Sequence, residues 1–111
     1  MKQKIESSSL EITINNVGAE LSSIKSKSTG LEYIWQANPN VWGSSAPVLF
    51  PIIGMLKEGK YKYEDNWFEL PKHGFIRNNE NLIVEEQQSD FVRYVLSSDE
   101  LTKQSYPFDF E

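Results

Sequence analysis

The side chains best suited to bind a small polar molecule gather in the segment 71–77. It holds the only histidine of the chain, His73, followed directly by Gly74 and, four residues after the histidine, by Arg77. An imidazole and a guanidinium can hydrogen-bond the polar groups of a substrate, and a glycine lets backbone approach closely. These three residues are therefore candidate substrate-binding residues. The alternative, which composition alone favours, is a turn whose histidine bonds backbone and whose arginine lies in solvent.

A second candidate segment, 36–59, is a long loop with an unusual composition. It carries three prolines and three glycines, yet it also holds Trp42 and the largely apolar run 48–53. Since surface loops are ordinarily polar, we expect this segment to pack over a sheet and to line a cavity. Trp42 could border that cavity and stack on a sugar face, although tryptophans more often belong to a core.

Antiparallel strands are expected to position these segments, because apolar and polar residues alternate along much of the chain. Leu10, Ile12 and Ile14, for example, alternate with Glu11 and Thr13. The pattern predicts an all-β, antiparallel fold, with strands at 10–14, 19–24, 32–35, 82–85 and 91–96.

The aromatic residues are expected to support these strands. Segments 61–63 and 67–70 flank a short polar turn, which predicts a hairpin in which Trp67 faces two tyrosines. Trp35 is expected to pack mainly in the core. Only residues 98–103 favour a helix, of one turn, with Ser98 or Asp99 as its N-cap.

Composition excludes several classes of function. The chain has 11 lysines and arginines against 16 aspartates and glutamates, a net charge of −5, and no clustered cations for a nucleic acid. No apolar run approaches the ~20 residues of a membrane span. The absence of cysteine excludes disulfides and cysteine-based zinc sites, and the single histidine excludes a multi-histidine metal site within the chain. We therefore expect a cytoplasmic protein with no nucleic-acid or membrane partner and with no metal or other cofactor.

A further alternation of apolar and polar residues begins at Tyr106 and stops with Glu111, which predicts the beginning of another strand. We therefore expect residues 1–111 to be the N-terminal part of a longer β protein. Such a part leaves strand edges unpaired and an apolar face uncovered. We expect it to form a homo-oligomer through exposed edges, or to dock onto the rest of a longer protein, with 91–96 or 106–111 involved. The alternative is a small closed barrel.

Taken in order, several segments resemble the aldose 1-epimerase (galactose mutarotase-like) superfamily, particularly its LacX-like branch. The resemblance runs nearly end to end, and the order of the segments makes it specific. They are 18–24, 32–35, Trp42, 46–54, 57–61, 73–77 and 106–110.

The resemblance implies a galactose mutarotase-like antiparallel β-sandwich of which residues 1–111 are the N-terminal part. It also implies an isomerase that binds an aldose or sugar phosphate and interconverts its anomers by general acid–base catalysis. His73 is then the ligand of a substrate hydroxyl, and Arg77 contacts the substrate. The family's catalytic acid and base have no counterpart before residue 111, so the catalytic residues are unknown and the chain alone is expected to be inactive.

The sequence also departs from the family. Met55 follows Gly54 where the family commonly has an arginine that binds sugar oxygens, and a thioether cannot replace the charged hydrogen bonds of that group. Two other readings therefore stay open: a non-catalytic carbohydrate-binding homologue, and a truncated, inactive β domain.

Overall fold

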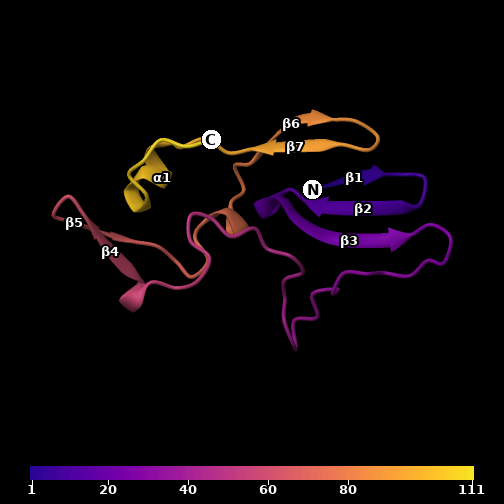
Figure 1. Ribbon diagram of the computed structural model, residues 1–111, viewed down its shortest axis with the longest axis horizontal. Helices are drawn as coiled ribbons and strands as arrows, with labels where there is room; N and C mark the ends of the chain where they lie inside the picture. Colours follow the sequence, from indigo (N-terminus) through magenta and orange to yellow (C-terminus); the bar gives the residue numbers. More distant parts are fainter.

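The computed structural model describes residues 1–111 as three small antiparallel sheets joined by long loops (Figure 1). The all-β prediction is confirmed. The sheets contain β1 (Lys2–Glu6), β2 (Leu10–Asn15) and β3 (Glu20–Ser26); β4 (Lys60–Tyr63) and β5 (Asn66–Glu69); and β6 (Ile83–Gln87) and β7 (Val92–Val95). The helical elements are short: α1 (Glu100–Ser105) and the 3-10 turns η1 (Val17–Ala19), η2 (Lys57–Gly59) and η3 (Ile76–Asn78).

The first sheet contains the two strands predicted at 10–14 and 19–24, as β2 and β3. It does not contain the strand predicted at 32–35, and it has β1 in addition. In β2, Ile12 lies opposite Ile5 of β1 and Ile24 of β3, so alternate residues share a face as the alternation requires. β1 was not predicted because its sequence is almost entirely polar. The strand expected at 32–35 is wrong: Glu32 makes only one bridge, to Lys25, and the chain then leaves the sheet.

The hairpin predicted around residue 65 is confirmed, but its aromatic pairing differs from the prediction. Tyr61 lies opposite Phe68, and their rings stack with centroids 5.6 Å apart. Trp67 lies opposite Lys62 and 5.5 Å from the Lys60 ammonium, so it makes a cation–π contact in place of a tyrosine pair. The register puts Trp67 on the face of the hairpin that carries the lysines.

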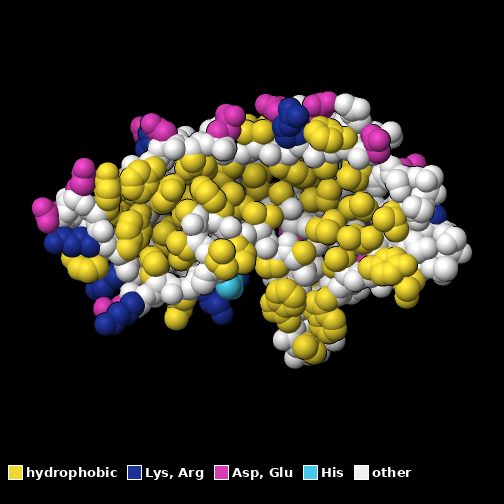
Figure 2. All heavy atoms as spheres, viewed as in Figure 1, with side chains coloured by type: hydrophobic (Ala, Val, Ile, Leu, Met, Phe, Trp, Pro, Cys, Tyr) yellow, Lys and Arg dark blue, Asp and Glu magenta, His cyan; other side chains and the backbone are white.

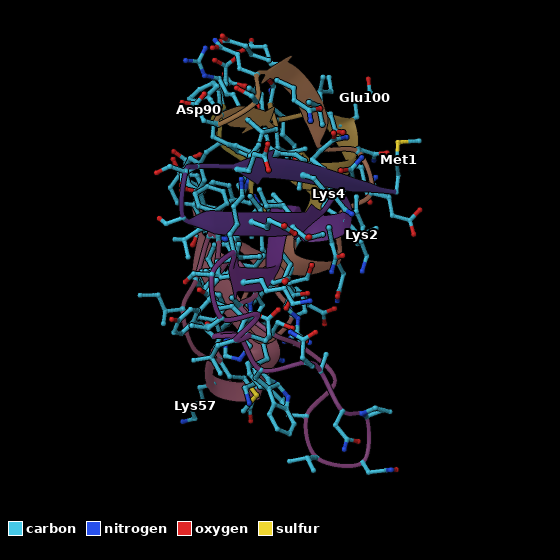
Figure 3. The ribbon with its side chains drawn as sticks, turned by 90° about the vertical axis from the view of Figure 1, so that its right-hand side faces the viewer. Met1, Lys2, Lys4, Lys57, Asp90 and Glu100 are labelled. Atoms are coloured by element: carbon cyan, nitrogen blue, oxygen red, sulfur yellow. The ribbon has the colours of Figure 1, made fainter.

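Trp35 does not pack in the core as expected. Its side chain is 44% exposed, and its indole N–H donates a 2.8 Å hydrogen bond to the carbonyl of Trp42. The two tryptophans lie in the loop after β3, which extends away from the strands in two views (Figures 1 and 3). A hydrogen bond that closes this loop on itself therefore holds Trp35 outside the core.

The end of the chain packs without forming the expected strand. The backbone N–H of Ser98 donates a hydrogen bond to the carbonyl of Phe110 at 2.9 Å. Its aromatic side chains contact Phe50, and the Phe50 and Phe110 ring centroids are 5.2 Å apart. The alternation thus supplies an aromatic cluster. The predicted helix is confirmed as α1, and Asp99 is its N-cap, with its carboxylate accepting from the Thr102 N–H.

The molecule is a thin slab of 57 × 34 × 18 Å. Six of its 111 residues are buried, and the buried hydrophobic ones are Leu70 and Leu96. The closed barrel considered above does not form, because the three sheets stay separate. None of the helical elements has the length and apolar character needed to cross a membrane.

Candidate functional site

Two loops that sequence analysis singled out lie against each other. Phe50 and Gly74 form a bridge in parallel orientation, and the Phe75 N–H donates to the Phe50 carbonyl at 2.9 Å. The His73 N–H donates to the Gly54 carbonyl at 2.8 Å. We call the segments 50–54 and 71–75 the paired loops. The prediction that segment 36–59 packs over a sheet and lines a cavity holds for Val48 and Phe50, which line an open groove beside β7, but not for the exposed part around Trp42.

Gly74 makes this pairing sterically feasible. Its φ is +76°, a conformation that side-chain-bearing residues rarely adopt. A Cβ built on Gly74 would lie 1.9 Å from the Phe50 carbonyl oxygen and 2.3 Å from its carbon. The close approach that a glycine permits here is between two backbone segments, while a contact of Gly74 with substrate stays a prediction.

His73 is held by both its backbone and its side chain. The residue is half-buried and has a φ of +70°. Its ring Nδ1 bonds the carbonyl oxygen of Ile53. Because a carbonyl oxygen can only accept, Nδ1 carries the proton in this contact and Nε2 is left as an acceptor. The paired loops therefore set both the orientation and the tautomer of the imidazole.

Arg77 lies in a different part of the structure. It belongs to η3, which packs against η1 where the Gly18 N–H donates to the Asn79 carbonyl at 2.9 Å. Its side chain lines a cavity of about 380 Å³. Figure 3 shows two further residues of that cavity, Met1 and Lys2, at the start of β1. No hydrogen bond or ion pair of the Arg77 guanidinium is formed within the chain.

The four predicted binding residues are not brought together in one cavity. The lining of the Arg77 cavity includes none of His73, Gly74 and Trp42. Trp42 is half exposed in the loop after β3, and its backbone N–H donates a hydrogen bond to the Asn38 carbonyl at 2.8 Å. The structure joins His73 and Gly74 in the paired loops, and a site shared with Arg77 and Trp42 stays a prediction.

Two carboxylates that sequence analysis did not single out hold the loops. Oε1 of Glu20 accepts from the N–H groups of Ser45 and Ala46, at 2.6 and 2.9 Å. It thereby fixes the start of the segment that leads to the paired loops. An isolated glutamate at the beginning of a strand carries no sequence pattern that could have revealed this role.

Glu32 holds the other end of the same loop. Its carboxylate accepts from the Ser23 hydroxyl at 2.5 Å and from the N–H groups of Ile24 and Ile34 at 2.9 and 3.0 Å. These hydrogen bonds, the one from Ser23 first, lower the pKa of Glu32 below its ordinary value.

Replacing Glu20 by alanine should free the start of the 44–50 segment. The two N–H groups lose an ionised acceptor, and hydrogen bonds to charged groups contribute about 1.5–3 kcal/mol each. We expect a loss of about 2 kcal/mol in the free energy of unfolding, since the site is partly open to water, and faster amide exchange at Ser45 and Ala46. Glu20→Gln, which keeps an acceptor oxygen, is the control. Unchanged exchange in the alanine variant would contradict this role.

Acid should weaken the loop after β3. A carboxylate whose pKa is lower in the folded than in the unfolded chain stabilises the fold above its ordinary pKa, and this contribution is lost as the pH falls through the lowered value. Chemical unfolding at pH 7 and at pH 3 should show an acid-dependent loss that is smaller in Glu32→Gln. Glu80→Gln is the matched control, because Glu80 makes no ion pair or side-chain hydrogen bond. Equal pH dependence in all three proteins would contradict the prediction.

Comparison with known proteins gives a consistent assignment. The aldose 1-epimerase family matches residues 1–111. Protein LacX (chromosomal) of Lactococcus lactis subsp. lactis is 34% identical over 116 residues, which cover 100% of this chain and 38% of LacX.

Two solved structures have the same fold over nearly the whole chain. A galactose mutarotase related enzyme from Lactobacillus acidophilus matches with a TM-score of 0.94 and 41% identity, over 98% of this chain and 36% of its own. A galactose mutarotase-like protein from Lactobacillus casei matches with a TM-score of 0.92 and 28% identity, over 98% of this chain and 37% of its own. The chain thus spans well under half the length of the proteins it matches. Because the family match extends over all 111 residues, the chain belongs to the aldose 1-epimerase family.

Proposed function

We propose that this chain supplies the sugar-binding part of a mutarotase-like isomerase. In the proposed reaction a carboxylate removes the proton of the anomeric hydroxyl and a histidine protonates the ring oxygen. The bond between C1 and the ring oxygen breaks, the C1–C2 bond rotates, and the reverse steps close the other anomer. We assign that acid and base to residues other than those of this chain. Membership in the aldose 1-epimerase family supports the reaction class.

The observation that carries the proposal is the geometry of His73. The bond from Nδ1 to the Ile53 carbonyl leaves Nε2 as a fixed acceptor on a half-buried ring. A pre-oriented acceptor suits a sugar hydroxyl, which must lose a bond to water when it binds. We therefore assign His73 to binding a substrate hydroxyl. The same bond fixes the direction in which Nε2 points, so the ring can meet a substrate in only one orientation.

Arg77 and Trp42 are proposed as further contacts to the sugar. The Arg77 guanidinium makes no ion pair within the chain, and Arg77 lines a polar cavity together with Asn15 and Ser44. Its donors suit the oxygens of a sugar or a sugar phosphate. The half-exposed Trp42 ring offers a flat apolar surface of the kind on which sugar rings stack.

A sugar titration tests this binding role. Trp42 lies at the surface, so a bound sugar should change its fluorescence when galactose, glucose or glucose 6-phosphate is added. Trp42→Phe should remove most of the change, while Trp67→Phe, in the distant β4–β5 hairpin, should leave it intact. If none of the sugars changes the fluorescence of a chain that circular dichroism shows to be folded, the proposal is contradicted.

The 111-residue chain alone should not accelerate mutarotation. Its one histidine is assigned to binding a substrate hydroxyl, and neither Glu58 nor Glu69 forms a hydrogen bond or an ion pair with it. Polarimetry of freshly dissolved α-galactose or α-glucose should therefore give the buffer rate at any protein concentration. Acceleration in proportion to protein that His73→Ala abolishes would show that the acid lies within this chain.

A non-catalytic sugar-binding role is the second candidate, and Met55 favours it. Met55 stands where the family's sugar-binding arginine was expected and is 71% exposed. It offers a ligand no charged donor. Sugar binding without polarimetric activity, in a longer protein that contains this segment, would favour this candidate over the isomerase.

A further inference from the structure

An open apolar groove of about 440 Å³ lies between β7, the paired loops and the end of the chain. Nine of its eleven lining residues are hydrophobic. Those that the argument uses are Val48, Phe50, Ile76, Leu82, Val95 and Phe110, and we call them the apolar face. They come from segments far apart in sequence, so the face is a product of the fold.

The exposed area is too large for a self-sufficient monomer. The chain exposes 7776 Å², whereas a compact monomer of its mass should expose about 6300 Å². The excess, about 1500 Å², exceeds the ~800 Å² per partner of a standard interface and lies in the range of obligate ones. The radius of gyration, 16.6 Å, is also larger than the ~13 Å of a compact domain of this length.

The distribution of charge resembles that of an interface. Hydrophobic side chains fill the middle of the surface drawn in Figure 2, and lysine, arginine, aspartate and glutamate side chains lie around its margin. An apolar centre with a polar rim is typical of a permanent contact. A second copy is a less favourable occupant, because it would bring a second net charge of −5 to the contact.

The sheets also need neighbours. β4–β5 and β6–β7 are two-stranded sheets that share no strand with another sheet, and a hairpin of this size depends on packing against other elements for its stability in water. The backbone nevertheless matches the Lactobacillus acidophilus structure with a TM-score of 0.94, although the match covers only 36% of that chain. In that protein the same arrangement is therefore accompanied by a much longer stretch of polypeptide outside the match.

We propose that the apolar face binds the complementary part of a galactose mutarotase-like chain, by which we mean the part that lies outside the match with residues 1–111. The occupant is a β-rich polypeptide with its own apolar face, and it can be supplied as a separate molecule. Binding covers Val48, Phe50 and Phe110 and gives the two-stranded sheets partners. This proposal rests on the fold and is independent of the reaction proposed above.

Mixing two separate polypeptides tests the proposal. The 111-residue chain is refolded with the complementary part of the Lactobacillus acidophilus protein, and that protein's own matching segment serves as the positive control. Sedimentation should show an equimolar complex. Fluorescence of an apolar dye should be high with the 111-residue chain alone and fall as the complex forms.

Variants locate the contact. Val48→Lys should weaken the complex at least tenfold, because Val48 is 39% exposed in the apolar face and would place a charge in the contact. Leu82→Lys, on another element of the same face, should do the same. Leu101→Lys, 64% exposed on α1 and outside the groove, should bind normally. Far-UV circular dichroism of each variant alone checks its fold.

The remaining outcomes overturn the proposal. One is a dimer of this chain that the complementary part cannot displace. Another is a compact monomer that does not bind the apolar dye. The third is that the complementary part binds its own segment but not this chain. A complex without polarimetric activity would leave the docking proposal intact and count against the proposed isomerase alone.

Discussion

Alanine at position 74 should destabilise the fold more than any other single methyl group added to the chain. Gly74 has a φ of +76°, and its new Cβ would lie 1.9 Å from the Phe50 carbonyl oxygen. Since the atoms it meets belong to backbone, no rotamer change can relieve the clash. The paired loops must separate, which removes the bonds from Phe75 to Phe50 and from His73 to Gly54.

Gly30→Ala separates this clash from the general cost of a positive φ. Gly30 has a φ of +71°, and a Cβ built there meets nothing within 4 Å. Gly30→Ala should lower the free energy of unfolding by only ~1–2 kcal/mol, which is the cost of placing an L-residue in the left-handed region. Urea unfolding at a fixed protein concentration should give a clearly larger loss for Gly74→Ala, or no cooperative transition at all. Equal losses in the two variants would show that the paired loops are not held in contact.

The fold was predictable where alternation is strong. The alternating apolar residues of 10–14 predicted β2 correctly, and the polar turn at Asp65 predicted the hairpin of β4 and β5 correctly. The alternation at 106–110 did not predict the structure correctly. Alternating aromatic residues are compatible with a strand and with an aromatic cluster, and tertiary contacts with Phe50 decide between the two. Alternation also failed at 32–35, where the backbone bonds to β3 end at Tyr33 and the Glu32 carboxylate accepts from the Ile34 N–H.

The sequence offers candidate residues for a site, but it does not reveal how the fold arranges them. The spacing of His73 and Arg77 indicated one loop, yet η3 begins at Ile76 and takes Arg77 to the contact with η1. The same contact involves Gly18, whose Cβ would lie 2.4 Å from the Arg77 carbonyl oxygen. Neither that approach nor the grip of Glu20 on the loop backbone has a local pattern, because both depend on segments more than 20 residues apart.

His73→Asn should reduce sugar binding and activity while leaving the fold intact. The asparagine amide can replace Nδ1 as the donor to the Ile53 carbonyl, and asparagine tolerates a φ of +70° better than most residues. It lacks any atom at the place of Nε2. A neutral hydrogen bond contributes about 0.5–1.5 kcal/mol, so we expect about a two- to tenfold loss in sugar affinity, and in kcat/KM once the chain is assembled with its complementary part.

The pair His73→Asn and His73→Gln separates the two roles of the ring. Glutamine carries its amide further from the backbone, so it can replace Nε2 but not the donor to Ile53. It should therefore keep more of the sugar affinity and lose more of the free energy of unfolding. Alanine is a poorer probe, because it removes both contacts and adds strain at a positive φ. The measurements are the tryptophan titration, polarimetry of the assembled complex and urea unfolding. Sugar affinity in His73→Asn equal to that of the parent chain would show that Nε2 binds no substrate hydroxyl, and the site would then have to lie elsewhere.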